Sequence, residues 1–286
     1  MRKIVALICA CLTAFSLCFA EDDTALYLDP DSLVAASCIL IDAGTGEVLY
    51  EKNADERRYP ASTTKIMTLL VSILNADGDA IVTVPACSQD ISLDSTRVPV
   101  YTGEEMPLRD LWYGLIYNSG NDAANAIAYL TSGSIEAFVD KMNETAAKLG
   151  MTNTHFANAH GLHSLEHYTT ARDMALLTKY ALDIDLFREI TLSTTYVMQP
   201  TANREALILS HKYSITDCTS QYFYKYAKGI KTGYTSQAGQ CFVSCAEKDG
   251  HELIVVILRA GWTKPEKWVD AKTLFEYGFK LLENRD

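Results

Sequence analysis

The sequence Tyr59-Pro60-Ala61-Ser62-Thr63-Thr64-Lys65-Ile66-Met67-Thr68 opens the first strongly helical segment of this chain. Apolar residues continue at helical spacing to Leu74, and the polar run 75–79 ends the segment. Ser62 and Lys65 stand three residues apart near the helix start, so their side chains share one face and can touch. A serine becomes a good nucleophile when a base takes its proton, and a lysine can be that base when its ammonium form is disfavoured. The segment therefore predicts a nucleophilic Ser62 with Lys65 as its base.

Two more short motifs follow, Ser119-Gly120-Asn121 and Lys231-Thr232-Gly233. An S-x-x-K pattern arises by chance about once in a chain of this length, whereas K-T-G arises by chance in fewer than about one such chain in ten. The ordered set of three is therefore the specific signal. If Lys231 approaches Lys65, the two cations will not both hold their protons easily, and we expect Lys231 to stay charged.

The second and third motifs suit opposite walls of a cleft. The Ser119 hydroxyl can relay a proton to a leaving amine, and the Asn121 amide can orient a peptide backbone. On an edge strand, Lys231 and Thr232 are expected to bind a terminal carboxylate. Gly233 would let a ligand approach the backbone there.

Acyl transfer also needs donors for the negative oxygen that develops on the attacked carbonyl. The backbone N–H groups of Ser62 and Tyr234 are the predicted oxyanion donors. This chemistry requires no cofactor and no metal ion, so neither is expected.

The rest of the pattern places strands at both ends of the chain and helices in the middle. The segment 107–190 is mainly helical, and a last amphipathic helix carries Trp268 and Phe279. We therefore predict an α/β (α+β) fold with a mainly antiparallel sheet flanked by helices and an inserted helical lobe. A substrate cleft is expected between the sheet edge and that lobe. The predicted strands are 35–41, 47–50, 226–232, 240–246 and 253–258.

The three motifs resemble those of the penicillin-binding proteins and serine β-lactamases. Their surroundings are similar to the DD-carboxypeptidase family of low-molecular-mass penicillin-binding proteins. The resemblance implies the serine β-lactamase/DD-peptidase (transpeptidase-like) fold and an acyl-enzyme on Ser62. It also implies removal of the terminal D-alanine from peptidoglycan stem peptides ending in D-Ala-D-Ala, and covalent inhibition by β-lactam antibiotics. The similar segments are 41–53, 59–68, 118–125, 169–175 and 228–239.

Two departures from the family pattern concern the placement of the substrate carboxylate. His160-Gly161-Leu162-His163 stands where the family commonly has His-Gly-Leu-Asp. Lys267 stands where an arginine often precedes the Asp-Ala of the last helix. Neither departure changes the expected chemistry.

Three alternative functions remain to be weighed against a carboxypeptidase. A β-lactamase needs a carboxylate that activates the deacylating water, and no E-x-x-L-N segment lies between the second and third motifs. A non-catalytic β-lactam sensor or wall-binding module would not need the complete set of reactive residues. DD-endopeptidase or transpeptidase activity uses the same residues and stays open as an alternative.

A metal site is the competing chemistry. His163-Ser164-Leu165-Glu166-His167 fits the zinc-peptidase pattern H-x-x-E-H, which requires a helix. Gly161 precedes this segment and no helical period runs through it. The segment is therefore interpreted as a loop that leads to an N-cap at Thr169 or Thr170.

The first 20 residues have the layout of a secretory signal peptide. Arg2 and Lys3 precede an uncharged stretch, and small residues at Cys18 and Ala20 suit a cleavage site. A retained anchor is the alternative. Residues 21–286 are expected to form one catalytic domain, with no C-terminal β-domain or amphipathic anchor. We expect the protein to be secreted and associated with the cell wall or periplasm, with no stable membrane anchor after cleavage.

The chain is acidic, with 25 Lys and Arg against 36 Asp and Glu and a net charge of −11. Such a surface repels nucleic acid and anionic lipid, so neither is expected as a partner.

Residues outside the motifs are interpreted as structural. Trp262 and Trp268 are expected in the core, with a position bordering the cleft as the alternative. Arg172 and Asp173 are expected to form a structural pair at a helix start. The cysteines beyond residue 20 are odd in number and spaced unlike a disulfide framework, so they are expected to be small buried thiols. They are Cys38, Cys87, Cys218, Cys241 and Cys245.

Overall fold

The computed structural model describes residues 26–92 and 94–285. The predicted signal peptide, residues 1–20, lies outside this part of the chain. Within the described ranges no helix combines the length and the apolar character needed to cross a bilayer.

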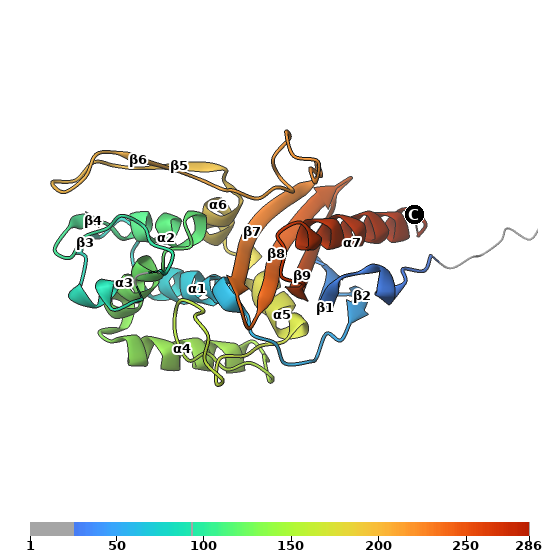
Figure 1. Ribbon diagram of the computed structural model, residues 1–286, viewed down its shortest axis with the longest axis horizontal. Helices are drawn as coiled ribbons and strands as arrows, with labels where there is room; N and C mark the ends of the chain where they lie inside the picture. Colours follow the sequence, from blue (N-terminus) through green and yellow to red (C-terminus); the bar gives the residue numbers. More distant parts are fainter. Residues whose placement is uncertain (1–25, 93, 286) are drawn as a thin grey trace, which may run out of the picture.

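A five-stranded antiparallel sheet joins the two ends of the described chain, as the sequence predicts (Figure 1). In spatial order its strands are β2 (Val48–Lys52), β1 (Ala35–Asp42), β9 (His251–Ala260), β8 (Gly239–Lys248) and β7 (Ala227–Thr235). The first strand of the chain thus pairs with the last. β7, which carries the third motif, is an edge strand of this sheet, and its outer side is open to a ligand.

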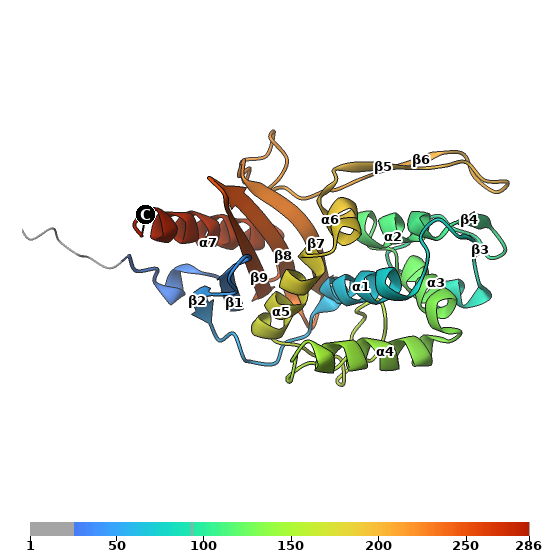
Figure 2. The same ribbon diagram turned by 180° about the vertical axis from the view of Figure 1, so that it is seen from behind.

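Helices cover both faces of the sheet. α7 (Glu266–Glu283) lies on one face and α5 (Ala171–Leu182) on the other, as Figures 1 and 2 show from opposite sides. Along β9, Val255 packs with the α7 side chains, whereas Ile254 and Val256 pack with the helical lobe. The side chains of a strand alternate between its faces, so a strand covered on both faces is apolar throughout.

The helical lobe predicted for 107–190 surrounds α1 (Lys65–Asn75), whose residues from Lys65 to Ser72 are all buried. This burial explains why α1 is apolar on most of its circumference. A 3-10 turn, η2 (Ala61–Thr64), leads directly into it. The other helices of the lobe are α2 (Leu108–Tyr117), α3 (Asn121–Ser132), α4 (Ile135–Lys148), α5 and α6 (Asp185–Leu192).

Two small hairpins were not predicted from the sequence. β3 (Ile81–Thr83) pairs with β4 (Glu105–Pro107), and β5 (Thr195–Met198) pairs with β6 (Leu207–Ser210). The second hairpin extends beyond the sheet along α6 and α2 (Figure 1). Their strands are only three or four residues long. Such short strands depend on tertiary contacts rather than on a local pattern.

Two further short 3-10 segments complete the described structure. They are η1 (Pro30–Ser32), before β1, and η3 (Ala86–Gln89), which packs against α3.

The predicted burial of the cysteines is correct for Cys38, Cys241 and Cys245 but wrong for Cys218, which is exposed. Cys87 is half-buried. Cys218 lies in the irregular segment between β6 and β7, where no strand periodicity places its side chain inward.

The prediction of a buried tryptophan is correct for Trp268 and wrong for Trp262, which is 55% exposed. Trp262 follows the end of β9, so no neighbouring strand covers it. Arg172 and Asp173 are structural, but they do not pair with each other. Arg172 binds Glu51 and Asp55, whereas Asp173 accepts hydrogen bonds from the loop before α5.

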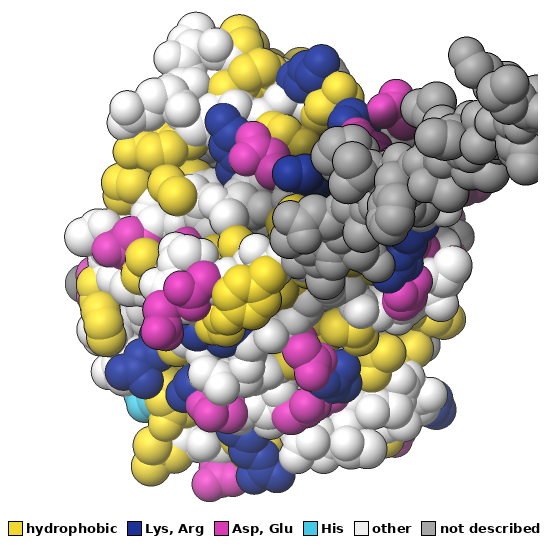
Figure 3. Space-filling view, turned by 90° about the vertical axis from the view of Figure 1, so that its right-hand side faces the viewer, with side chains coloured by type: hydrophobic (Ala, Val, Ile, Leu, Met, Phe, Trp, Pro, Cys, Tyr) yellow, Lys and Arg dark blue, Asp and Glu magenta, His cyan; other side chains and the backbone are white. Residues whose placement is uncertain are grey.

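Charges of both signs are interspersed on the face drawn in Figure 3. No broad basic surface gathers on this face, which includes the C-terminal end of α7. Among the described side chains of this face, charge of one sign is therefore not gathered in a single patch.

Candidate active site

Ser62 lies in the 3-10 turn η2, immediately before α1. The preceding Ala61 has a φ of 49°, in the left-handed region that L-residues rarely adopt. Side-chain hydroxyls hold this turn, because Thr63 Oγ1 donates to Pro60 O at 2.8 Å and Thr64 Oγ1 donates to Ala61 O at 2.8 Å. Strain that neighbouring contacts maintain in this way is typical of functional turns.

Lys65 brings the first two motifs together. Its Nζ lies 3.1 Å from Ser62 Oγ, 2.7 Å from Asn121 Oδ1 and 2.6 Å from the carbonyl oxygen of His160. A neutral amine has two N–H donors and one lone pair. The two carbonyl-type oxygens can only accept, so they take both N–H groups. The lone pair then remains for the hydroxyl proton of Ser62.

The surroundings of Lys65 favour this neutral form. Complete burial is the main cause that lowers the pKa of Lys65 well below its ordinary value. The positive charge of Lys231 lowers this pKa further, whereas the negative charge of Asp122 raises it. The influence of Lys231 on this pKa is what the predicted proximity of the two lysines requires.

Lys231 is also buried, and its Nζ donates to the carbonyl oxygen of Thr232 at 2.9 Å. Burial is the main cause that lowers the pKa of Lys231 to about 7, and the charge of Lys267 adds to the shift. The pKa values of both buried amines are therefore lowered; that Lys65 gives up its proton before Lys231 stays a prediction. With a pKa of about 7, Lys231 is protonated in only part of the molecules at neutral pH.

Ser119 occupies a strained position on the opposite wall, with a φ of 58°. Its Oγ is buried and has no hydrogen-bond partner among the described residues. A buried hydroxyl is rarely left unpaired, so one that faces a cavity is available to a ligand. Asn121 follows at the start of α3 and is itself buried against Lys65.

Gly233 allows β7 to pack directly on the turn that carries the nucleophile. A Cβ at this position would lie 2.9 Å from Ser62 N and 3.0 Å from Pro60 O. Any larger residue would push the strand and the turn apart, so the glycine holds the two motifs in contact.

One cavity of about 450 Å³ contains residues from all three motifs. Sequence reasoning missed three residues of its wall, Thr96, Gln240 and Lys264, whereas a place beside the cleft was the alternative interpretation of Trp262. These come from loops and strand ends, where no motif marks a side chain as facing the cleft. The predicted site residues that line the cavity are Ser62, Ser119, Thr232, Gly233 and Tyr234.

Lys267, one of the two departures from the family pattern, also lines this cavity, and its Nζ donates to Gln240 Oε1. Burial is the main cause that lowers the pKa of Lys267 to about 8, and Lys264 adds to the shift. Lys264 and Lys267 are therefore the lysines of the cavity wall, whereas Lys65 and Lys231 are fully buried and do not line it.

In the other departure from the family pattern, the two histidines make different contacts. His160 contributes its carbonyl oxygen to Lys65, whereas His163 is exposed and packs edge-on against Tyr59 at 4.6 Å. His163 therefore lies beside the turn that carries the nucleophile but makes no contact with Lys65.

The segment 163–167 is a loop, as predicted, and not the helix that the zinc-peptidase pattern requires. His167 is buried, and both of its ring nitrogens contact the protein. Nδ1 accepts from Ala157 N at 2.9 Å, and Nε2 lies 2.7 Å from Thr64 Oγ1. The predicted N-cap is also correct, because the Thr170 side chain accepts from Asp173 N at the start of α5.

Comparison with known proteins agrees with this arrangement. The family profile described as D-alanyl-D-alanine carboxypeptidase matches residues 24–261. D-alanyl-D-alanine carboxypeptidase DacF of Bacillus subtilis (strain 168) is 34% identical, over 87% of this chain and 63% of its own length. DacA of Escherichia coli (strain K12) is 32% identical, over 99% of this chain and 71% of its own length.

Solved structures of this class superpose closely. The DD-transpeptidase of Streptomyces K15 has a TM-score of 0.79 at 30% identity, over 87% of this chain and 98% of the other. The D-alanyl-D-alanine carboxypeptidase of Mycobacterium tuberculosis H37Rv has a TM-score of 0.81 at 30% identity, over 90% of this chain and 95% of the other. These neighbours confirm the predicted fold.

The chain spans 63% of the length of DacF and 65% of DacC from Escherichia coli (strain K12). The matched region nevertheless contains all three motifs and most of the wall of their cavity, of which only Trp262, Lys264 and Lys267 lie beyond it. The chain belongs to the D-alanyl-D-alanine carboxypeptidase family.

Proposed function

We propose that this protein is a serine D-alanyl-D-alanine carboxypeptidase that removes the terminal D-alanine from peptidoglycan stem pentapeptides. One observation carries the proposal: Lys65 Nζ contacts two oxygens that can only accept, and its third neighbour is Ser62 Oγ. This geometry prepares a neutral amine to take the proton of the serine.

In the acylation step, Ser62 Oγ attacks the carbonyl carbon of the penultimate D-alanine and its proton passes to Lys65 Nζ. A C–O bond forms, and the carbonyl oxygen gains the negative charge. The backbone N–H groups of Ser62 and Tyr234 are the proposed donors to this oxygen. The proximity of Gly233 to Ser62 N supports the pairing of these two segments.

Collapse of this intermediate breaks the C–N bond and releases D-alanine. The proton that the leaving nitrogen needs comes from Lys65 through the hydroxyl of Ser119, whose unpaired and buried Oγ supports this relay. Lys231 and Thr232 are proposed to bind the carboxylate of the departing residue. Lys267 adds a further positive charge on the same wall.

Water then attacks the ester carbonyl of the acyl-enzyme and gives its proton to Lys65. The shortened stem peptide leaves, and Ser62 recovers its hydroxyl proton. A β-lactam undergoes the same acylation, but ring opening leaves its amine attached to the acyl group. We therefore propose β-lactams as covalent inhibitors of this protein.

We further propose that the protein acts outside the cytoplasm, on the cell wall. Export would follow from the signal layout of residues 1–20, and residues 21–286 would form the catalytic domain.

Labelling and turnover test the proposal together. Purified protein is incubated with fluorescent penicillin, or with a pentapeptide ending in D-Ala-D-Ala, in parallel with Ser62→Ala. We expect one label per molecule and release of D-alanine by the parent protein, and neither by the variant. Hydrolysis of penicillin at tens of turnovers per second would identify a β-lactamase instead. Cleavage of cross-linked dimers without release of D-alanine would identify an endopeptidase.

A further inference from the structure

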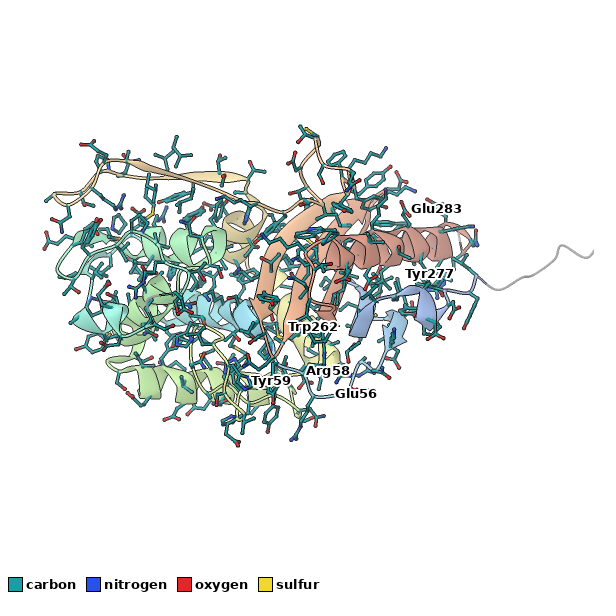
Figure 4. All side chains as sticks on the ribbon, viewed as in Figure 1. Glu56, Arg58, Tyr59, Trp262, Tyr277 and Glu283 are labelled. Carbon is teal, nitrogen blue, oxygen red and sulfur yellow. The ribbon has the colours of Figure 1, made fainter. Side chains whose placement is uncertain are left out.

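A second cavity of about 420 Å³ adjoins the turn that carries Ser62. Arg57, Arg58 and Tyr59 line one side of it, and Arg259 enters from the end of β9. Tyr59 and Ser62 are three residues apart, so their Cα atoms are at most about 11 Å from each other. Figure 4 shows Arg58, Tyr59 and Trp262 at the same end of the sheet, where β7 turns into β8.

The arginines of this cavity differ in their partners. Arg58 already has protein partners, because its Nε donates to Ser37 Oγ at 3.0 Å and its guanidinium forms an ion pair with Glu56. Arg57 instead lies over the ring of Tyr168, with its Cζ 4.4 Å from the ring centroid. Among the described residues, no carboxylate lies within 4.0 Å of the Arg57 guanidinium.

Arg259 is placed in the same way. Its Cζ lies 5.4 Å from the ring centroid of Trp262, and no described carboxylate lies within ion-pair distance of it. Contact with a ring leaves the N–H groups at the edge of a guanidinium free to bind an oxyanion. Two guanidinium groups that have no carboxylate partner among the described residues thus face one cavity. The net charge of the protein is −11.

The cavity also contains one acidic side chain and an apolar wall. Glu166 lines it and is exposed, and Leu165 beside it is 74% exposed. Tyr59 adds an aromatic surface to the same cavity. Besides Arg58, which is paired with Glu56, the cavity therefore presents two cations, one anion and apolar side chains, which suits a long side chain with a zwitterionic end.

The order of residues along β7 shows which part of a peptide would reach this cavity. Lys231 and Thr232 come first, Gly233 and Tyr234 follow beside Ser62, and Gln237 and Ala238 at the β7–β8 turn line the second cavity. A substrate with its terminal carboxylate at Lys231 and its reacting carbonyl at Ser62 extends its acyl part in the same direction. An extended chain covers about 3.3 Å per residue, so the residue before the penultimate one stands closer to this cavity than the reacting carbonyl does, and a long side chain is needed to span the rest of the distance.

We infer that this cavity is a subsite for the third residue of the stem peptide, and that it selects a diamino dicarboxylic acid over lysine. The inference rests on the proposed carboxypeptidase function. The side-chain carboxylate binds Arg57 and Arg259, the amino group on the same carbon faces Glu166, and the methylene groups pass Leu165 and Tyr59. A lysine side chain brings only an ammonium group, which the two arginines repel.

Two pentapeptides that differ only at the third residue test this inference. One carries the diamino dicarboxylic acid and the other carries lysine, and both end in D-Ala-D-Ala. We expect the parent protein to release D-alanine from the first with a kcat/KM at least about tenfold higher, as for a charge-assisted hydrogen bond. Arg57→Ala and Arg259→Asn should each lower kcat/KM for the first peptide about tenfold. The kcat/KM values for the two peptides should then be nearly equal in each variant. Asparagine suits position 259 because its φ is 59°.

Arg285→Ala is the matched control, because this exposed arginine pairs with Glu47, which precedes β2 at the edge of the sheet opposite β7. It should keep the preference of the parent protein. Equal kcat/KM for both peptides in the parent protein, or an equal loss for both in Arg57→Ala, would overturn the inference. Fluorescent penicillin reports separately on Ser62. Absence of labelling and of any D-alanine release would instead refute the proposed function itself.

Discussion

His167 Nε2 lies 2.7 Å from Thr64 Oγ1, so the loop before α5 is tied to the turn that carries the nucleophile. The Nδ1 of the same ring accepts from Ala157 N, which fixes the proton of a neutral imidazole on Nε2. Thr64 then receives one hydrogen bond and donates its own to Ala61 O. This chain of contacts holds Ala61 in its left-handed conformation beside Ser62.

Acid should destabilise the protein through this buried histidine. Burial lowers the pKa of His167 to about 3, and the pKa of His160 falls to about 3 for the same main reason. Because the folded pKa lies below the ordinary value of about 6.5, protonation favours the unfolded chain. The free energy of unfolding should therefore decrease as the pH falls from about 6.5 towards 3.

Denaturant unfolding at a series of pH values measures this effect. His167→Ala removes one titrating group but leaves Ala157 N–H unpaired, so we expect a loss of about 1–3 kcal/mol at pH 7. The stability of this variant should depend less on pH than that of the parent protein. An identical pH dependence in both proteins would contradict the assignment.

Replacing Asn121 with aspartate should slow acylation. A carboxylate 2.7 Å from Lys65 Nζ favours the ammonium form and raises the lysine pKa. The fraction of neutral lysine falls about tenfold for each unit of this rise. The rate of penicillin labelling, followed against pH, should therefore show its rising limb at higher pH in Asn121→Asp. An unshifted limb would show that Lys65 is not the base.

Gly161 packs against the turn that carries the nucleophile. Its φ is 88°, and a Cβ there would lie 2.0 Å from Ala61 O. We expect Gly161→Ala to destabilise the fold by at least about 2 kcal/mol and to slow penicillin labelling, because the turn must move.

Gly150→Ala is the matched control for this substitution. Its φ of 77° carries a similar conformational cost, but no atom lies within 4 Å of the added Cβ. It should lose only about 1–2 kcal/mol and keep the labelling rate of the parent protein. Equal labelling rates in both variants would show that contact with Ala61 does not hold the site.

Lys267→Arg should extend the pH range of peptide binding. The pKa of Lys267 is about 8 in the folded protein, so its charge is lost as the pH rises through this value. An arginine stays charged over this range. KM for a D-Ala-D-Ala peptide should rise above about pH 8 in the parent protein and much less in the variant.

Lys231 has a pKa of about 7, so loss of its charge should cause a separate rise in KM near pH 7 in both the parent protein and the variant. If KM follows the same curve in both proteins over the whole range, Lys267 does not bind the substrate carboxylate.

The local features of this protein follow from short stretches of its amino-acid sequence. The spacing of Ser62 and Lys65 predicts their contact, since residues three apart at a helix start share a face. Apolar periodicity predicted the strands of the main sheet, and the absence of a helical period identified 163–167 as a loop. These features depend on neighbours within a few residues.

Only the tertiary structure decided which distant groups complete the site. The acceptors of Lys65 are 56 and 95 residues away, and no local pattern specifies that Asn121 and His160 meet there. The exposure of Trp262 and the cavity around Arg57 and Arg259 likewise depend on how the ends of β7, β8 and β9 pack beside η2. Periodicity assigns a side chain to one face of its own element. The packing of separate elements then decides what covers that face and which groups meet on it.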